Sequence, residues 1–166
     1  MKKTILLFLS ILLFSNFLYS SEKLYSFVGV QSSISKFDNS YSPTLDLKYG
    51  KQSKNIRSTI IYSYGQSHNS DFQSLILQID SAILASRFTD IAYKPYLGLS
   101  LGGIQQNNSK LLSQHDRGLA YGINGGLSYV LNTNTDLNLE YRFLKTSNME
   151  FLNQVNNISI SMHYFY

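Results

Sequence analysis

Residues 157–166 read Asn-Ile-Ser-Ile-Ser-Met-His-Tyr-Phe-Tyr, or NISISMHYFY. Large apolar or aromatic side chains occupy every second position, and smaller or polar ones fall between them, with Phe165 as the exception. Neighbouring side chains of a β-strand point to opposite faces of the sheet, so this period of two predicts a strand with one apolar face. The printed sequence stops on Tyr166, inside that pattern.

The same alternation recurs along the chain, and the stretches between are rich in Ser, Asn, Asp, Gln and Gly, as turns are. It predicts seven further strands, within residues 24–32, 44–50, 58–65, 74–83, 94–103, 121–131 and 136–143. Eight strands joined in sequence by polar turns favour a single antiparallel, up-and-down sheet.

Composition agrees with one β-rich domain of 166 residues. Charged residues make up only 14% of the chain, against roughly 25% in a typical soluble protein. Tyr occurs 13 times and Phe 10 times, whereas Cys is absent. The lack of Cys excludes disulfides, thiolate metal sites and cysteine nucleophiles.

The first segment has the pattern of an export signal. Lys2 and Lys3 precede an apolar run at 5–14, and small residues follow near an expected cleavage after Ser20 or Ser21. The apolar run is too short to span a bilayer as a helix, which needs about 20 residues. We therefore expect a signal peptide at 1–20 and a mature domain at 21–166. Without the two lysines the net charge falls to +2, which gives no indication of nucleic-acid binding.

The size of the polar side chains indicates which face lies inside. The polar face carries mainly Gly, Ser, Asn, Ala and Thr, whereas the apolar face carries Leu, Ile and Val with Tyr and Phe nearer the strand ends. An eight-stranded barrel has a lumen just wide enough for side chains, and an outer-membrane barrel turns an apolar band with aromatic girdles toward lipid. The sequence thus predicts an all-β, eight-stranded, antiparallel transmembrane β-barrel of the outer-membrane type. A soluble, secreted, lipocalin-like barrel is the alternative that would place the apolar face inside.

Six charged residues fall on the predicted inner face, and they form a candidate polar network in the lumen. Glu140 and Arg142 share one strand, so we expect them to pair with each other or with Asp80 and Lys94 across the barrel. Such pairs either hold the barrel together or act as a gate that rearranges. The six residues are Asp46, Lys48, Asp80, Lys94, Glu140 and Arg142.

The alternation also sets a topology. With the N-terminus in the periplasm, every second connection lies there. We expect these turns at 51–55, 85–91 and 132–135, and the outward loops at 33–43, 66–71, 105–117 and 146–154. Asn107, Asn108, Gln114 and Asp116 are candidates for contact with an extracellular ligand by their position alone.

Three motifs resemble those of small OmpA-like and opacity-type outer-membrane β-barrels. KPYLGLSLGG at 94–103 resembles a strand common to those proteins, and LNLEYRF at 137–143 resembles another near their end. The final strand resembles their C-terminal insertion signal, although its last residue is Tyr rather than the usual Phe. The resemblance implies the outer membrane as location, with membrane lipid or lipopolysaccharide and the barrel assembly machinery as partners. The residues of that signal are Ile158, Ile160, Met162, Tyr164 and Tyr166.

The histidines give no convincing catalytic or metal site. His68 and Ser70 have the spacing of the His-x-Ser motif of outer-membrane lipid A deacylases, but Ala82 stands where an acid is needed. His115 lies in the longest predicted loop. The sequence allows it to be either a solvated loop residue or a contact to a metal or ligand. His163 faces the predicted lumen. We therefore expect no catalysis and no cofactor.

A structural or surface-interaction role in adhesion or membrane integrity is the function that the sequence favours. Loops on a closed barrel are the parts that such a role would use. A narrow channel with a charged lumen and the soluble binding barrel remain the alternatives.

Overall fold

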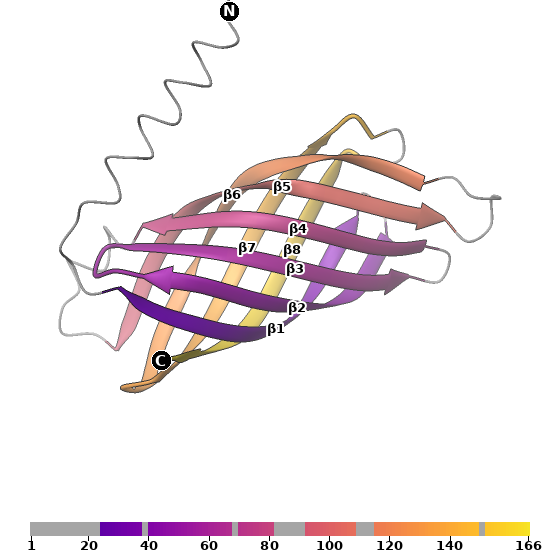
Figure 1. Ribbon diagram of the computed structural model, residues 1–166. Helices are drawn as coiled ribbons and strands as arrows, with labels where there is room; N and C mark the ends of the chain where they lie inside the picture. The colour runs from indigo at the N-terminus through magenta and orange to yellow at the C-terminus, as the bar shows by residue number, and fades with distance from the viewer. Residues whose placement is uncertain (1–23, 38–39, 68–69, 82–91, 109–114, 150–151) are drawn as a thin grey trace, which may run out of the picture.

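The computed structural model describes residues 24–37, 40–67, 70–81, 92–108, 115–149 and 152–166. They form a closed barrel of eight strands, in which each strand is antiparallel to both neighbours and β8 closes the ring against β1 (Figure 1). The predicted fold is therefore confirmed. The predicted signal peptide at 1–20 lies outside the described residues. The strands are β1 (Tyr25–Phe37), β2 (Ser40–Gln52), β3 (Ile56–Ser67), β4 (Ser70–Ser81), β5 (Tyr93–Asn108), β6 (His115–Asn132), β7 (Thr135–Ser147) and β8 (Gln154–Phe165).

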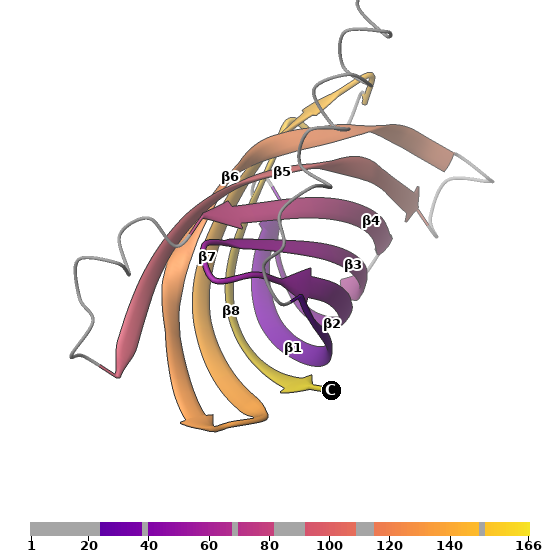
Figure 2. The ribbon, with the colours of Figure 1, turned by 60° about the vertical axis from the view of Figure 1, so that its left-hand side comes forward.

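The strands curve round a common interior, with β1 beside β8 (Figure 2). We call the end that carries the connections after β1, β3, β5 and β7 the loop end, and the opposite end the turn end. The turn end holds Tyr25 and Tyr166 and the tight turn in which Asn132 pairs with Thr135. The predicted turn at 85–91 lies outside the described residues. No helix long and apolar enough to cross a membrane occurs among the described residues.

Side chains alternate between the two sides of the wall as the sequence predicts. Leu99 is 68% exposed on the outside, whereas Asp46 is 1% exposed on the inside. The large apolar residues of the outer face are exposed on all eight strands. The lipocalin-like alternative is therefore wrong, because it requires this apolar face to line the interior.

Close packing explains why the inner face is rich in glycine. At eight of the ten glycines a Cβ would lie within 2.4 Å of another atom; at Gly122, for example, the carbonyl oxygen of Phe143 would be 1.8 Å away. All eight occupy the alternate positions of their strands that face the lumen. Larger residues there would push neighbouring strands apart. Gly103 and Gly125 are the two exceptions, and both face outward.

The strands extend further toward the loop end than predicted, which corrects the four predicted outward loops. β1 and β2 continue through most of 33–43, and 66–71, 105–117 and 146–154 likewise contain strand residues. Inward hydrogen bonds explain the difference: Asn157 Nδ2 donates to Ser33 Oγ and Ser35 Oγ, at 2.8 Å each. Short polar residues that resemble a turn by composition are here the lumen-facing positions of strands.

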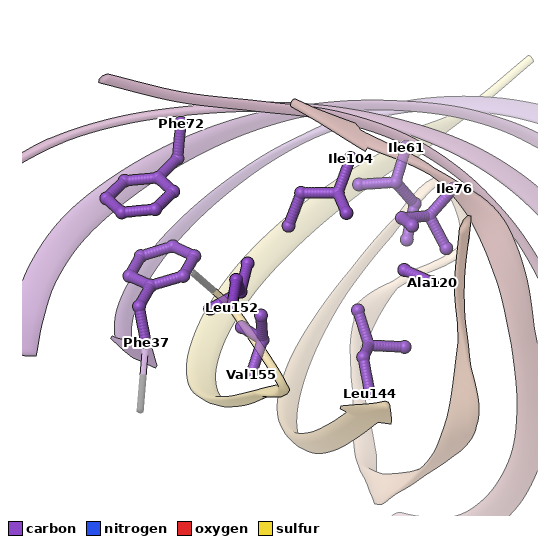
Figure 3. Close-up of a cluster of buried hydrophobic side chains, with 9 residues drawn as sticks. All are labelled: Phe37, Ile61, Phe72, Ile76, Ile104, Ala120, Leu144, Leu152 and Val155. Carbon is purple, nitrogen blue, oxygen red and sulfur yellow. The ribbon is translucent and has the colours of Figure 1, made fainter. Parts of the chain in front are cut away.

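The inner face is also less uniformly polar than the sequence predicts. Nine buried apolar residues fill the lumen from its middle toward the loop end (Figure 3). The rings of Phe37 and Phe72 stack with centroids 3.8 Å apart and planes inclined by 5°. We call this group the apolar cluster; it consists of Phe37, Ile61, Phe72, Ile76, Ile104, Ala120, Leu144, Leu152 and Val155.

Candidate functional site: the barrel lumen

Glu140 on β7 is the most connected charged residue of the lumen. Its Oε1 lies 2.5 Å from Arg142 NH2, and its Oε2 lies 3.9 Å from Lys48 Nζ. Gln78 Nε2 and the Tyr96 hydroxyl also donate to Oε2, at 2.8 and 3.0 Å. All of these groups are buried. A carboxylate deprived of water is stabilised when cations and donors surround it in this way.

Amide groups, rather than a cation, bind the second acid of the lumen, Asp80. Asn124 Nδ2 donates to Asp80 Oδ1 at 2.6 Å, and Gln78 Nε2 lies 3.0 Å from both carboxylate oxygens. Gln78 thereby links Asp80 to Glu140. Ser100 extends the network, since its hydroxyl donates to Asn124 Oδ1 at 3.0 Å.

Asp46 and Lys48 complete the middle of the lumen from β2. Asp46 accepts a hydrogen bond from the side-chain amide of Gln31 on β1. Lys48 Nζ lies 3.5 Å from the hydroxyl of Ser161 on β8 as well as near Glu140. Seven strands, β1, β2, β4, β5, β6, β7 and β8, thus contribute polar residues to the middle of the lumen. Glu140 on β7 contacts those of β2, β4 and β5.

Of the six residues predicted for the network, five are buried in the lumen: Asp46, Lys48, Asp80, Glu140 and Arg142. Lys94 is not among them. Lys94 occupies a position of β5 that alternates with the outward-facing residues. However, it is the second residue of that strand, at the turn end, and its side chain is exposed. Of the two predicted arrangements, Glu140 pairs with Arg142, and the partners of Asp80 are the amides of Asn124 and Gln78.

A second group of charges at the turn end was not predicted. Arg57 NH2 lies 2.6 Å from Asp136 Oδ2, and its NH1 donates to Asn138 Oδ1 at 3.1 Å. The guanidinium also lies over the rings of Phe27 and Phe165. Sequence reasoning missed Arg57 because the third strand was expected to begin at residue 58, one residue after it. Continuing the alternation of β3 back by one residue would have placed Arg57 on the inner face.

His163 belongs to this second group and, with its neighbours, has the residue types of a catalytic triad. His163 Nδ1 lies 2.8 Å from Asp136 Oδ1, and Ser161 Oγ lies 3.4 Å from His163 Nε2. A nucleophile and its base normally approach to about 2.6–3.2 Å. Ser161 is 3% exposed, and the ring of Phe27 lies 4.8 Å from that of His163. A substrate carbonyl therefore has no access to the hydroxyl in this arrangement.

The other histidines add no site within the described residues. His68 lies outside the described residues, and His115 is the first residue of β6, where its backbone pairs with Asn107. No group of three or more His, Asp or Glu side chains that could hold a metal ion occurs in the described parts of the chain. Of the candidate ligand contacts, Asn107, Asn108 and Asp116 are strand residues, and Gln114 lies outside the described residues.

The residues of the predicted insertion signal all face outward and are exposed on or next to β8. Tyr166 NH donates to the carbonyl of Ser26 at 3.0 Å, which continues the ladder between the two ends of the chain. Their part in assembly stays a prediction.

Comparison with known proteins places the fold among outer-membrane barrels. No family model and no curated protein matches the chain. Among solved structures, Neisserial surface protein A is 15% identical, with 86% of this chain and 97% of that chain aligned at a TM-score of 0.69. Ail of Yersinia pestis, solved with the heparin analogue sucrose octasulfate, is 16% identical over 89% and 100% at 0.53. The outer membrane enzyme PagL is 13% identical over 82% and 98% at 0.50.

These three barrels have different roles, and their identities are low. The likeness therefore shows the fold alone. It supports a small outer-membrane barrel, while membership of the OmpA-like and opacity-type family remains part of the proposal below.

Proposed function

We propose that the chain is a small integral outer-membrane β-barrel of the OmpA-like or opacity type, without catalysis, that serves a structural or surface-interaction role. The apolar outer face and the closed strand ring support residence in a membrane. Tyr25 and Tyr166 lie at the turn end, and we place this end in the periplasm and the loop end outside the cell. Membrane lipid and the barrel assembly machinery are the partners that this role requires.

The observation that carries the proposal is the sealed lumen. The apolar cluster occupies the half of the lumen toward the loop end. The interior cavity beside it measures about 30 Å³ and is lined by Phe37, Phe72, Ile104, Leu144 and Val155 together with Arg142, Gln73 and smaller polar residues. That volume corresponds to about one water molecule. A hydrated ion is larger than this space, so its passage would require the surrounding side chains to move apart.

One observation favours the narrow channel as a second candidate: charges of both signs lie buried in the other half of the lumen. The ion pairs of Glu140 would have to rearrange for such a channel to open, and the apolar cluster would have to part as well. A structural or surface-interaction role requires neither the ion pairs nor the apolar cluster to move.

Conductance in a planar bilayer separates the two candidates. We expect the full-length mature protein to insert without reproducible current steps. The double variant Phe37→Ala/Phe72→Ala, which removes both stacked rings of the apolar cluster, is expected to conduct measurably more. The matched control Tyr62→Ala/Tyr64→Ala removes two rings from the outer face and should stay silent. A reproducible open state of the unaltered protein would overturn the sealed-lumen proposal.

Location is tested separately by fractionation. We expect the protein in the outer-membrane fraction, with faster migration on gels before boiling than after it, because a folded barrel stays compact in detergent. A protein recovered monomeric from plain buffer would contradict the membrane assignment.

A further inference from the structure

Gly103 on β5 has no packing reason to be glycine. An added Cβ would meet no atom within 4 Å, in contrast to the eight inward glycines. Glycine in the interior of a strand is destabilising relative to alanine, because it orders a more flexible backbone and packs no side chain. Its position on the outer wall leaves a notch in the apolar surface. Such a glycine commonly marks a place where a ligand approaches the backbone.

The notch is part of an outward-facing groove of about 330 Å³. The strand register arranges its lining in two adjacent rows. Leu75 and Gly103 are cross-strand partners in the apolar row, and Gln73, Gln105 and Arg117 are successive partners in the polar row. Tyr62, the partner of Leu75 on β3, borders the apolar row.

The groove lies where the outer face changes from apolar to polar. One step toward the loop end, Leu75 gives way to Gln73 on β4, Gly103 to Gln105 on β5 and Leu119 to Arg117 on β6. In a membrane-spanning barrel this change marks the border between hydrocarbon and headgroups. The groove therefore has an apolar half in the hydrocarbon and a polar half at headgroup level.

Arg117 supplies a positive charge at that level. Its side chain is exposed, and neither an ion pair nor a hydrogen bond involves it within the described parts of the chain. Gln105 is turned toward the loop end, where its Nε2 donates to Asn107 Oδ1 at 2.8 Å. A guanidinium with free donors is well suited to a phosphate group.

We propose that this groove binds an anionic membrane lipid, with an acyl chain in the notch at Gly103 and the headgroup phosphate on Arg117. The inference deepens the proposed function, on which it rests, by assigning a site to its lipid partner. Apolar residues border the notch on both sides, so the molecules that contact it in a bilayer are lipids. Free phosphate would use only the polar half of the groove and is expected to bind far more weakly.

The outer wall offers a comparison site. A groove of about 480 Å³ surrounds the other outward glycine, Gly125, but its outward lining is apolar, from Leu97, Leu99, Ile123 and Tyr141. It can accommodate acyl chains and has no cation to select a headgroup. Lys145 on β7 is an exposed, outward cation near the same border, and it lines neither groove. Gly125 is therefore the matched control for Gly103, and Lys145 is the matched control for Arg117.

Native mass spectrometry of the full mature protein tests the site. The protein would be released from detergent micelles that contain equal amounts of phosphatidylglycerol and phosphatidylcholine, and folding of each variant would be checked by gel migration. We expect one phosphatidylglycerol to be retained in preference to phosphatidylcholine. Arg117→Ala should weaken that retention about fivefold, as expected for one cation near a lipid surface, whereas Lys145→Ala should not.

Filling the notch tests the acyl-chain half. Gly103→Leu should lower retention of both lipids at this site, whereas Gly125→Leu should leave the preference for phosphatidylglycerol unchanged. Equal retention by the unaltered protein, Arg117→Ala and Gly103→Leu would overturn the proposal, as would full competition by inorganic phosphate. Such a failure leaves the sealed lumen unaffected, because conductance tests that separately.

Discussion

The two halves of the lumen solve the same packing problem with different chemistry. Toward the loop end, nine apolar side chains fill the space and two of them stack as aromatic rings. Toward the turn end, four acids and three strong bases are held in contact by amides and hydroxyls: Asp46, Asp80, Asp136, Glu140, Lys48, Arg57 and Arg142. Both halves are buried inside one continuous ring of strands.

The difference shows that a barrel interior can be closed without being uniformly polar or apolar. Apolar packing tolerates small shifts, because dispersion contacts are numerous and non-directional. A buried polar network tolerates few, because each unpaired group keeps its full desolvation cost. The polar half should therefore be the more sensitive to a single substitution.

The largest effect is expected from Glu140→Ala. The substitution removes the partner of Arg142 at 2.5 Å and of Lys48, and it leaves both cations buried. Breaking one side of a buried ion pair costs about 3–5 kcal/mol. Urea titration of the barrel in phospholipid vesicles, followed by the gel migration of folded and unfolded protein, measures the loss of unfolding free energy.

Glu140→Gln is the control for that prediction. It keeps the length of the side chain and an acceptor for Gln78 or Tyr96, and it removes only the charge. Glu140→Gln should lower the free energy of unfolding less than Glu140→Ala does. Wild-type stability in Glu140→Ala would show that the polar half is not held together by this carboxylate.

Ile61→Ala is the corresponding test of the apolar half, with a somewhat smaller expected loss of about 3 kcal/mol. Ile61 is fully buried in the apolar cluster, and the substitution leaves a cavity there. Ile60, the preceding residue on the same strand, faces outward and is 49% exposed. Ile60→Ala should cost less in the same urea titration, because lipid can fill the space. Equal losses would contradict the assignment of the two faces.

Ile61 also shows where the sequence was informative and where it was not. The period of two placed Ile60 and Ile61 on opposite faces and so predicted the barrel, its strand number and the inward position of most polar residues. It did not reveal that Ile61, Ile76 and Leu144 would meet across the lumen, because that depends on the register between strands. Register is fixed by pairings such as Ile61 with Ile76, which alternation within one strand does not specify.

The same limit explains the errors at the strand ends. Ser33, Ser35 and Asn157 have the composition of a turn, but their side chains bind one another inside the barrel. Arg57 was left out because the start of β3 was placed too late. Conversely, Lys94 was included in the predicted lumen network because the alternation of side chains does not indicate how far from the rim of the barrel a residue lies.

Lys94→Ala is the smallest expected effect and tests that last error directly. A lysine inside the network would leave an acid unpaired on removal and cost several kcal/mol, as at Glu140. The structure instead leaves Lys94 exposed at the turn end, with Asp80 bound by Asn124 and Gln78. Exposed substitutions of this kind usually change stability by no more than about 0.5 kcal/mol. Because Glu140→Ala and Lys94→Ala would be measured in the same urea titration, a loss at Lys94 comparable to that at Glu140 would return Lys94 to the network and extend the polar half of the lumen to the rim.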